Sequence, residues 1–285
     1  MIIKKILNNN VITTNDQDTK LEKVVMGRGL AFNKKLGDLV DLSKVEKVFT
    51  IENQKENIMF QRLLNEIPMD YVKISEAIID YARKTLRVDF AEHIYVALTD
   101  HLAFAIKRHE KGIQIKNDLL WEIKRIHRSE YNVGVWALDY VEKELGIKME
   151  LDEAGYIALH LIDASLDQEM DSTLNMTKII QEILNIIKYF FTIDLDENDM
   201  SFDRLITHLR YFAQRVIAKK QVKDEAQPFL DMVKKNYEEP YNCVIKIKKF
   251  IGKNYDYYVN DAEIVYLTIH IERIIYHIKN NSNKE

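Results

Sequence analysis

Two stretches that each carry a histidine decide the fold, because the same pair of stretches occurs twice. The first pair is Thr99-Asp100-His101-Leu102-Ala103-Phe104-Ala105-Ile106-Lys107-Arg108 and Glu153-Ala154-Gly155-Tyr156-Ile157-Ala158-Leu159-His160. The second pair is Thr207-His208-Leu209-Arg210-Tyr211-Phe212-Ala213-Gln214-Arg215 and Glu263-Ile264-Val265-Tyr266-Leu267-Thr268-Ile269-His270. In both pairs an aromatic and an arginine follow the first histidine at equal offsets, and a glutamate and a tyrosine precede the second. These offsets place the residues near one helix face, so we predict an internal repeat of roughly 110 residues.

Composition indicates a cytoplasmic globular protein with several domains. The chain has 285 residues, 47% of them hydrophobic, and only 3 Pro and 8 Gly, which favours two or three largely helical domains. A single cysteine, Cys243, cannot form an internal disulfide, which suits a reducing cytosol. The sequence shows no signal peptide and no apolar run long enough to cross a bilayer, so we expect no stable membrane insertion.

The charge is distributed unevenly along the chain. Residues 1–35 hold 7 Lys and Arg against 3 Asp and Glu, a balance of +4, whereas the whole chain carries −4, so the remainder carries −8. Any contact with nucleic acid is therefore expected in the N-terminal segment.

The N-terminal segment is expected to be a small all-β domain. Apolar-rich runs predict four short antiparallel strands at 2–7, 11–14, 21–26 and 45–51. The triplet Asn8-Asn9-Asn10 predicts a tight turn, and residues 15–18 predict another. A sheet of this size buries too little apolar area to be stable alone, so we expect the domain to form a homodimer.

From about residue 56 the apolar spacing becomes helical, and two homologous all-α five-helix domains are predicted. Residues 56–86 read as one helical stretch, and Pro240 reads as a helix break. The further helices of both domains are expected at 91–108, 119–131, 133–145, 151–166, 176–191, 203–218, 229–237, 244–255 and 262–278. The domain boundaries are accordingly 1–56, 57–170 and 171–285, with the junction between the helical domains at 167–172.

The four repeated histidines suggest a functional role, and three kinds of chemistry compete. A di-metal bundle would need Glu-x-x-His spacing, which no histidine here has. No nucleophile elbow and no glycine-rich phosphate loop is present, so we expect neither an enzyme, a metal nor a cofactor. A neutral imidazole can instead accept a phosphoryl group, whose charge Arg108 and Arg215 could receive.

In the N-terminal segment one set of residues suits RNA with exposed bases better than a DNA duplex. It offers amides for base edges, cations for phosphates, an aromatic ring for stacking and glycines for close approach. Its members are Lys5, Asn8, Asn9, Asn10, Gly27, Arg28 and Phe32.

Over essentially its whole length the chain resembles the BglG/SacY/LicT family of transcriptional antiterminators, and most of all the branch that serves β-glucoside utilisation. The resemblance rests on Lys5 with Asn8-Asn9-Asn10-Val11-Ile12, Met26-Gly27-Arg28-Gly29-Leu30-Ala31-Phe32, Leu98-Thr99-Asp100-His101, the stretch from Glu153 to His160, Thr207-His208 with Phe212-Ala213-Gln214-Arg215, and Tyr266-Leu267-Thr268-Ile269-His270-Ile271-Glu272-Arg273.

The resemblance implies an RNA-binding domain that dimerises and binds a leader mRNA hairpin, so that an overlapping terminator cannot form. It implies two further helical domains regulated by the phosphotransferase system. His101 and His160 would be sites of inhibition by a sugar permease (enzyme II), and His208 and His270 sites of activation by the phosphocarrier HPr. Asp100 would shape the environment of the first site. The alternative is a DNA-binding operon activator with the same regulatory domains.

Overall fold

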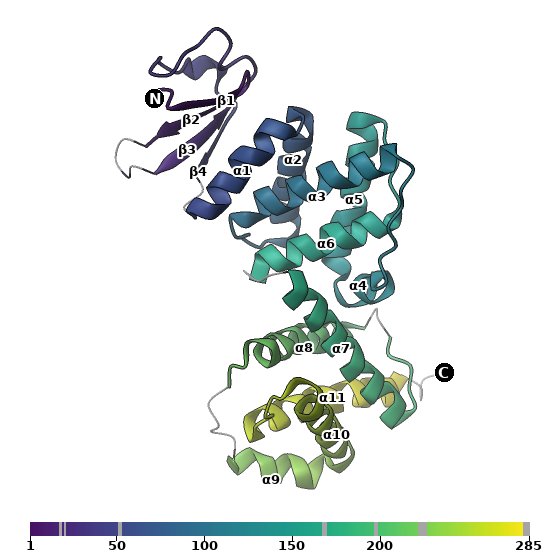
Figure 1. Cartoon of the computed structure of the whole chain (residues 1–285). Helices are drawn as coiled ribbons and strands as arrows, with labels where there is room; N and C mark the ends of the chain where they lie inside the picture. The colour runs from purple at the N-terminus through teal and green to yellow at the C-terminus, as the bar shows by residue number, and fades with distance from the viewer. Residues whose placement is uncertain are drawn as a thin grey trace. The chain divides into compact units, whose positions relative to one another are not determined.

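The chain folds into two compact units. The computed structural model describes residues 1–16, 19, 21–50, 53–166, 170–196, 199–221 and 227–281. One unit is Met1–Leu120 with Ser129–Gln168, and the other is Trp121–Arg128 with Glu169–Glu285. The first contains a sheet and helices, and the second is helical (Figure 1). Within the described part of the chain, no helix is both long and apolar enough to span a membrane.

The N-terminal segment forms the predicted four-stranded antiparallel sheet, in the order β1-β2-β3-β4. The strands are β1 (Lys5–Asn8), β2 (Val11–Asn15), β3 (Glu22–Met26) and β4 (Lys47–Thr50). The asparagine triplet makes the turn between β1 and β2, with an irregular register at Asn8. Ile2, expected in the first strand, forms only an isolated bridge to Leu39. Residues 17, 18 and 51 of the predicted turn and last strand lie outside the described residues.

Each face of the sheet has its own apolar cluster, because alternate side chains of a strand point to opposite faces. One cluster is covered by the segment between β3 and β4, and it comprises Ile3, Ile12, Val25, Leu30, Ala31 and Val40. The other cluster comprises Val11, Val24, Met26, Phe49, Phe60, Leu64, Val72 and Val96.

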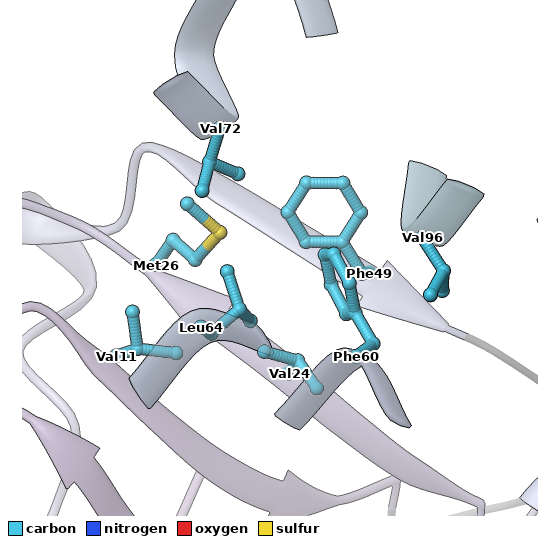
Figure 2. Packing of buried hydrophobic residues seen from close by; sticks show 8 residues of the cluster. All are labelled: Val11, Val24, Met26, Phe49, Phe60, Leu64, Val72 and Val96. Carbon is cyan, nitrogen blue, oxygen red and sulfur yellow. The ribbon is translucent and has the colours of Figure 1, made fainter. Parts of the chain in front are cut away.

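Helices of the same chain cover this second face. Figure 2 shows Phe60 and Leu64 of α1 (Gln54–Glu66), Val72 of α2 (Met69–Leu86) and Val96 of α3 (His93–Glu110) against the sheet. The rings of Phe49 and Phe60 meet edge to face at 5.1 Å. We expected a second copy of the chain to bury this apolar face of the sheet. In this conformation helices of the same chain bury it.

The helices of the two repeats follow in the predicted order, with shifted ends. They are α4 (Leu120–Ile126), α5 (Arg128–Leu145), α6 (Leu151–Leu166), α7 (Met170–Phe191), α8 (Met200–Ala218), α9 (Gln227–Asn236), α10 (Glu238–Tyr255) and α11 (Asp261–Asn281). Residues 167–169 of the predicted junction lie outside the described residues.

Three details of the predicted helices were wrong. The stretch 56–86 is two helices, because Pro68 directly precedes α2 and separates it from α1. The break between α4 and α5 falls at His127 rather than after Tyr131. Pro240 does not end a helix but lies in the first turn of α10, where an amide N–H would have no partner within the helix.

Helix α4 contributes to the second unit, although the sequence repeat places it in the first helical domain. The guanidinium of Arg210 in α8 donates to the Ile126 carbonyl at 2.8 Å. Buried His127 lies with its Nε2 3.0 Å from the Thr177 hydroxyl in α7, and its burial holds the pKa of this ring well below its usual value. His127 has no counterpart in the other repeat and is explained by this packing.

Replacing Phe60 by alanine should lower the free energy of unfolding by about 3–5 kcal/mol, the usual loss for a buried phenylalanine. Phe60 is fully buried between α1 and the sheet, so its removal leaves a cavity in that contact. Chemical denaturation would measure the change. Ile58→Ala on the exposed side of α1 is the control and should be nearly neutral, because that side chain is 47% exposed. Equal losses for the two variants would contradict the packing of α1 on the sheet.

Candidate functional site

Two loops of the N-terminal domain lie side by side because the backbone of one bonds to the other. The Gly27 amide donates to the Asn10 carbonyl at 2.9 Å, and the Ala31 amide donates to the Asn9 carbonyl at 3.0 Å. The Asn10 side chain accepts a third bond from the Gly29 amide at 2.8 Å. The asparagine turn and the loop after β3 therefore form one continuous surface.

This surface carries the side chains that suit RNA. Asn9, Arg28 and Phe32 are exposed, and 63% of the Phe32 surface is accessible to solvent. A side chain at Gly27 would overlap the Lys44 carbonyl, so only glycine fits there. Gly29 has a φ of 66°, a conformation that favours glycine.

Two predicted RNA-binding residues also bond to α1. The Lys5 ammonium donates to the Gln61 side chain at 3.3 Å, and the Asn8 amide donates to the Leu64 carbonyl at 2.7 Å. The Asn8 side chain also accepts a bond from the Asn10 amide, which closes the turn. Lys5 and Asn8 thus hold the turn against α1.

The first histidine pair lies between α3 and α6. The rings of His101 and His160 are 4.9 Å apart, and the Glu153 carboxylate lies beside them. One carboxylate oxygen is 3.1 Å from His101 Nε2, at ion-pair distance but not aligned as a hydrogen bond. The other accepts from Arg108 at 2.6 Å. Asp100 is exposed next to His101.

The second histidine pair lies between the corresponding helices of the second repeat, α8 and α11. The rings of His208 and His270 are 3.7 Å apart, and the Tyr266 hydroxyl contacts His208 Nδ1. The Glu263 carboxylate accepts from Arg215 Nε at 3.1 Å. Each of the two predicted arginines is thus paired with a carboxylate.

Three of the four histidines are held in the neutral form that can act as a nucleophile. Burial, followed by the neighbouring His101 and His93, lowers the pKa of His160 to about 3. Burial together with His208 and Arg273 lowers the pKa of His270 to about 4, and burial with Arg273 lowers that of His208. Burial raises the pKa of Glu153, but His101 and Arg108 outweigh it and keep this group ionised.

Comparisons with known proteins match the N-terminal sheet and both helical repeats. The CAT RNA binding domain family matches residues 1–57, and the PRD domain family matches residues 76–164 and 181–274. Transcription antiterminator LicT of Bacillus subtilis (strain 168) is 45% identical over 275 residues, which cover 96% of this chain and 99% of that protein. The chain belongs to this family of transcription antiterminators.

Two further proteins that this antiterminator resembles indicate the same family and fold. The beta-glucoside operon antiterminator of Dickeya chrysanthemi is 42% identical and covers 96% of both chains. The crystal structure of GlcT CAT-PRDI is similar with a TM-score of 0.50 and 34% identity, over 57% of this chain and 97% of that one. The family and the fold class expected from the sequence are thus confirmed.

Sequence reasoning missed two residues of the antiterminator's sites. Gln61 joins Lys5 to a polar group around Glu22, and Tyr257 donates its hydroxyl to Glu263 at 2.8 Å. Gln61 lies on a helix far along the chain from Lys5, and Tyr257 corresponds to no aromatic in the first repeat. Neither motif spacing nor the repeat could therefore indicate them. Within the described residues, no three His, Cys, Asp or Glu side chains are grouped to hold a metal ion.

Replacing His160 by glutamine should make the antiterminator less sensitive to acid. The pKa of His160 is about 3 in the folded chain against 6.5 for the free group, so the unfolded chain binds more protons between these values. Stability that is present above pH 6.5 is then lost as the pH falls towards 3, with a slope of about 1.4 kcal/mol per pH unit from this group.

Urea unfolding at several pH values would compare the slopes. The variant should show the shallower slope, while His277→Gln, which removes an exposed histidine, should match the parent. A His160→Gln slope equal to the parent's would show that this ring does not titrate as described.

Proposed function

We propose that the chain is a sugar-responsive cytoplasmic antiterminator that binds, as a dimer, a hairpin in a leader mRNA and so prevents an overlapping terminator from forming. The joined surface of the asparagine turn and the loop after β3 carries this proposal. It presents Arg28 for phosphates, Asn9 for base edges and Phe32 for stacking on two loops that backbone hydrogen bonds join. Unpaired bases of a loop or bulge need that combination.

In the regulatory part of the proposal, the paired histidines are phosphorylated and no residue of the chain is catalytic. HPr phosphorylates His208 and His270 and activates, whereas a sugar permease phosphorylates His101 and His160 and inhibits. The support is the geometry of two adjacent, half-buried imidazoles in each repeat, between helices that an arginine and a glutamate join. The opposite signs of the two pairs rest on the family resemblance.

A phosphoryl group would change the electrostatics of either site. It adds nearly two negative charges at neutral pH between helices that already bury a carboxylate. In the second repeat Arg215 can turn from Glu263 to the phosphoryl oxygens, which leaves Glu263 without its cation. Because a buried unpaired carboxylate is costly, the helices α8 and α11 are expected to shift.

Replacing Arg28 by alanine should weaken binding of the leader hairpin by about tenfold or more, the usual effect of losing a charged hydrogen bond. A gel shift with the hairpin would measure affinity, and duplex DNA of matched length would serve as competitor. Lys55→Ala removes an equal charge from the exposed start of α1 and should leave affinity nearly unchanged.

If Arg28→Ala bound the hairpin as the parent does, Arg28 would not belong to the RNA surface. Tighter binding of the parent to duplex DNA than to the hairpin would favour a DNA-binding activator instead.

Replacing His208 and His270 together by aspartate should mimic the charge of phosphorylation in part and raise antitermination without HPr. The same double change at His101 and His160 should lower it. A reporter placed behind the leader and terminator would measure both effects, with His277→Asp as a control on the exposed end of α11. Loss of antitermination in a folded His208→Asp, His270→Asp variant would reverse the proposed sign.

A further inference from the structure

The glutamates that occupy the same place in the two repeats have different partners. In the first repeat a Glu153 oxygen lies 3.1 Å from His101 Nε2. In the second, Glu263 accepts from the Tyr257 hydroxyl at 2.8 Å and from Arg215 at 3.1 Å. Among the contacts of the described residues, none brings Glu263 within 4.0 Å of His208.

This difference follows from one position in the loop before the last helix of each repeat. Helices α5 and α10 end at Leu145 and Tyr255, and each is followed by a residue in the left-handed conformation, Gly146 at φ 71° and Asp256 at φ 47°. The next residue is isoleucine at 147 in the first repeat and tyrosine at 257 in the second. Only the second repeat therefore has a hydroxyl at this point.

The space around that hydroxyl also differs between the repeats. The Tyr257 side chain is buried with its ring 6.4 Å from that of Phe212, four residues after His208. The residue four after His101 is Ala105, which lines a pocket of about 210 Å³ together with Met149 and Glu153. Since a cavity of about 150 Å³ holds a benzene ring, the first repeat has room for the ring that the second supplies.

Tyr257 is a suitable donor to a permanent carboxylate. Burial and the bond to Glu263 both raise the pKa of its hydroxyl, so the proton stays on oxygen and points to an acceptor. Its second contact, at 3.0 Å, is the Lys220 carbonyl, which also fixes the ring in place. Tyr257 thus holds Glu263 towards the loop and away from His208.

The chemistry of phosphoryl acceptance gives this arrangement a consequence. A ring nitrogen attacks phosphorus with its lone pair, the N–P bond forms, and the bond from phosphorus to the donor's leaving group breaks with its electron pair. A carboxylate beside a ring nitrogen keeps a proton there and repels the incoming anionic group. Glu153 therefore obstructs Nε2 of His101. Among the contacts of the described residues, Nε2 of His208 has no carboxylate within 4.0 Å, and it carries the lone pair when Nδ1 holds the ring proton and donates it to the Tyr266 oxygen.

We propose that Tyr257 is a positioning residue that makes His208 the readier phosphoryl acceptor, by keeping Glu263 away from Nε2 of that ring. The proposal rests on the proposed phosphorylation of the paired histidines and deepens it. It assigns the different behaviour of the two repeats to one hydroxyl, in addition to any difference in the proteins that dock on them.

The test uses phosphoramidate, a small donor whose reaction with imidazole releases ammonia and needs no docked protein. The full chain is incubated with it, and peptide mass spectrometry follows phosphate at His101 and His208 over time. The parent should label His208 about fivefold faster, the factor expected from one hydrogen-bonded contact. Tyr257→Phe keeps the ring but removes the hydroxyl, and should slow His208 by a similar factor without changing His101.

The reciprocal variant and the control complete the design. Ile147→Tyr introduces a phenol at the corresponding position of the first repeat, two residues before Met149 of the pocket, and should speed labelling of His101. Tyr258→Phe changes the neighbouring exposed ring and should alter neither rate. Thermal unfolding checks that each variant is folded. If Tyr257→Phe does not fold, Ile147→Tyr still tests the proposal.

Two results would contradict two different proposals, the role of Tyr257 and the phosphorylation of the histidines. Labelling of both sites at rates that neither Tyr257→Phe nor Ile147→Tyr changes would overturn the role of Tyr257 and leave histidine phosphorylation standing. A parent chain in which none of the four paired histidines takes phosphate would instead overturn the proposed phosphorylation itself.

Discussion

Each repeat depends on a buried contact between an arginine and a glutamate. Arg108 and Glu153 join α3 to α6 at 2.6 Å, and Arg215 and Glu263 join α8 to α11 at 3.1 Å. A buried carboxylate that loses its cation costs several kcal/mol, so the contact fixes one helix against the other. The first histidine lies two turns before the arginine and the second two turns after the glutamate. The same ion pair therefore brings the two imidazoles together.

In the N-terminal domain backbone geometry has the corresponding role. The Asn10 side chain and two carbonyls of the asparagine turn bind amides of the loop after β3, and Gly27 allows that loop to pass close to Lys44. With these polar groups satisfied inside, Arg28 and Phe32 remain on the outside. The shape of the surface is set by asparagines and glycines whose structural use does not depend on contact with RNA.

The sequence predicted those features of the structure that local residue patterns determine. Apolar alternation predicted the sheet, helical spacing predicted the helices, and equal offsets predicted an internal repeat in which each histidine shares a helix face with its arginine or its glutamate. Contacts between distant segments were not accessible in this way, as the bonds of Lys5 and Asn8 to α1 show. The apolar face around Phe49 illustrates the limit. Either a second copy of the chain or the chain's own α1 could cover this apolar face. The alternation of apolar residues in the strands is the same in both cases, so it could not show which of them does.

A comparison of the two repeats detects only residues that both repeats have. Tyr257 occurs in the second repeat alone, so this comparison could not indicate it. Both repeats retain the arginine, the glutamate and the histidines, whereas Ala105 and Ile147 stand where Phe212 and Tyr257 fill the second site. Two identical sites would respond alike to one phosphoryl donor, so a duplicated domain can act as an opposed pair only if something beside the shared framework differs. Under the proposal for Tyr257, a hydroxyl that turns a buried carboxylate away from one imidazole makes the two acceptors unequal, because it changes the charge next to the reacting nitrogen without disturbing the ion pair that holds the helices.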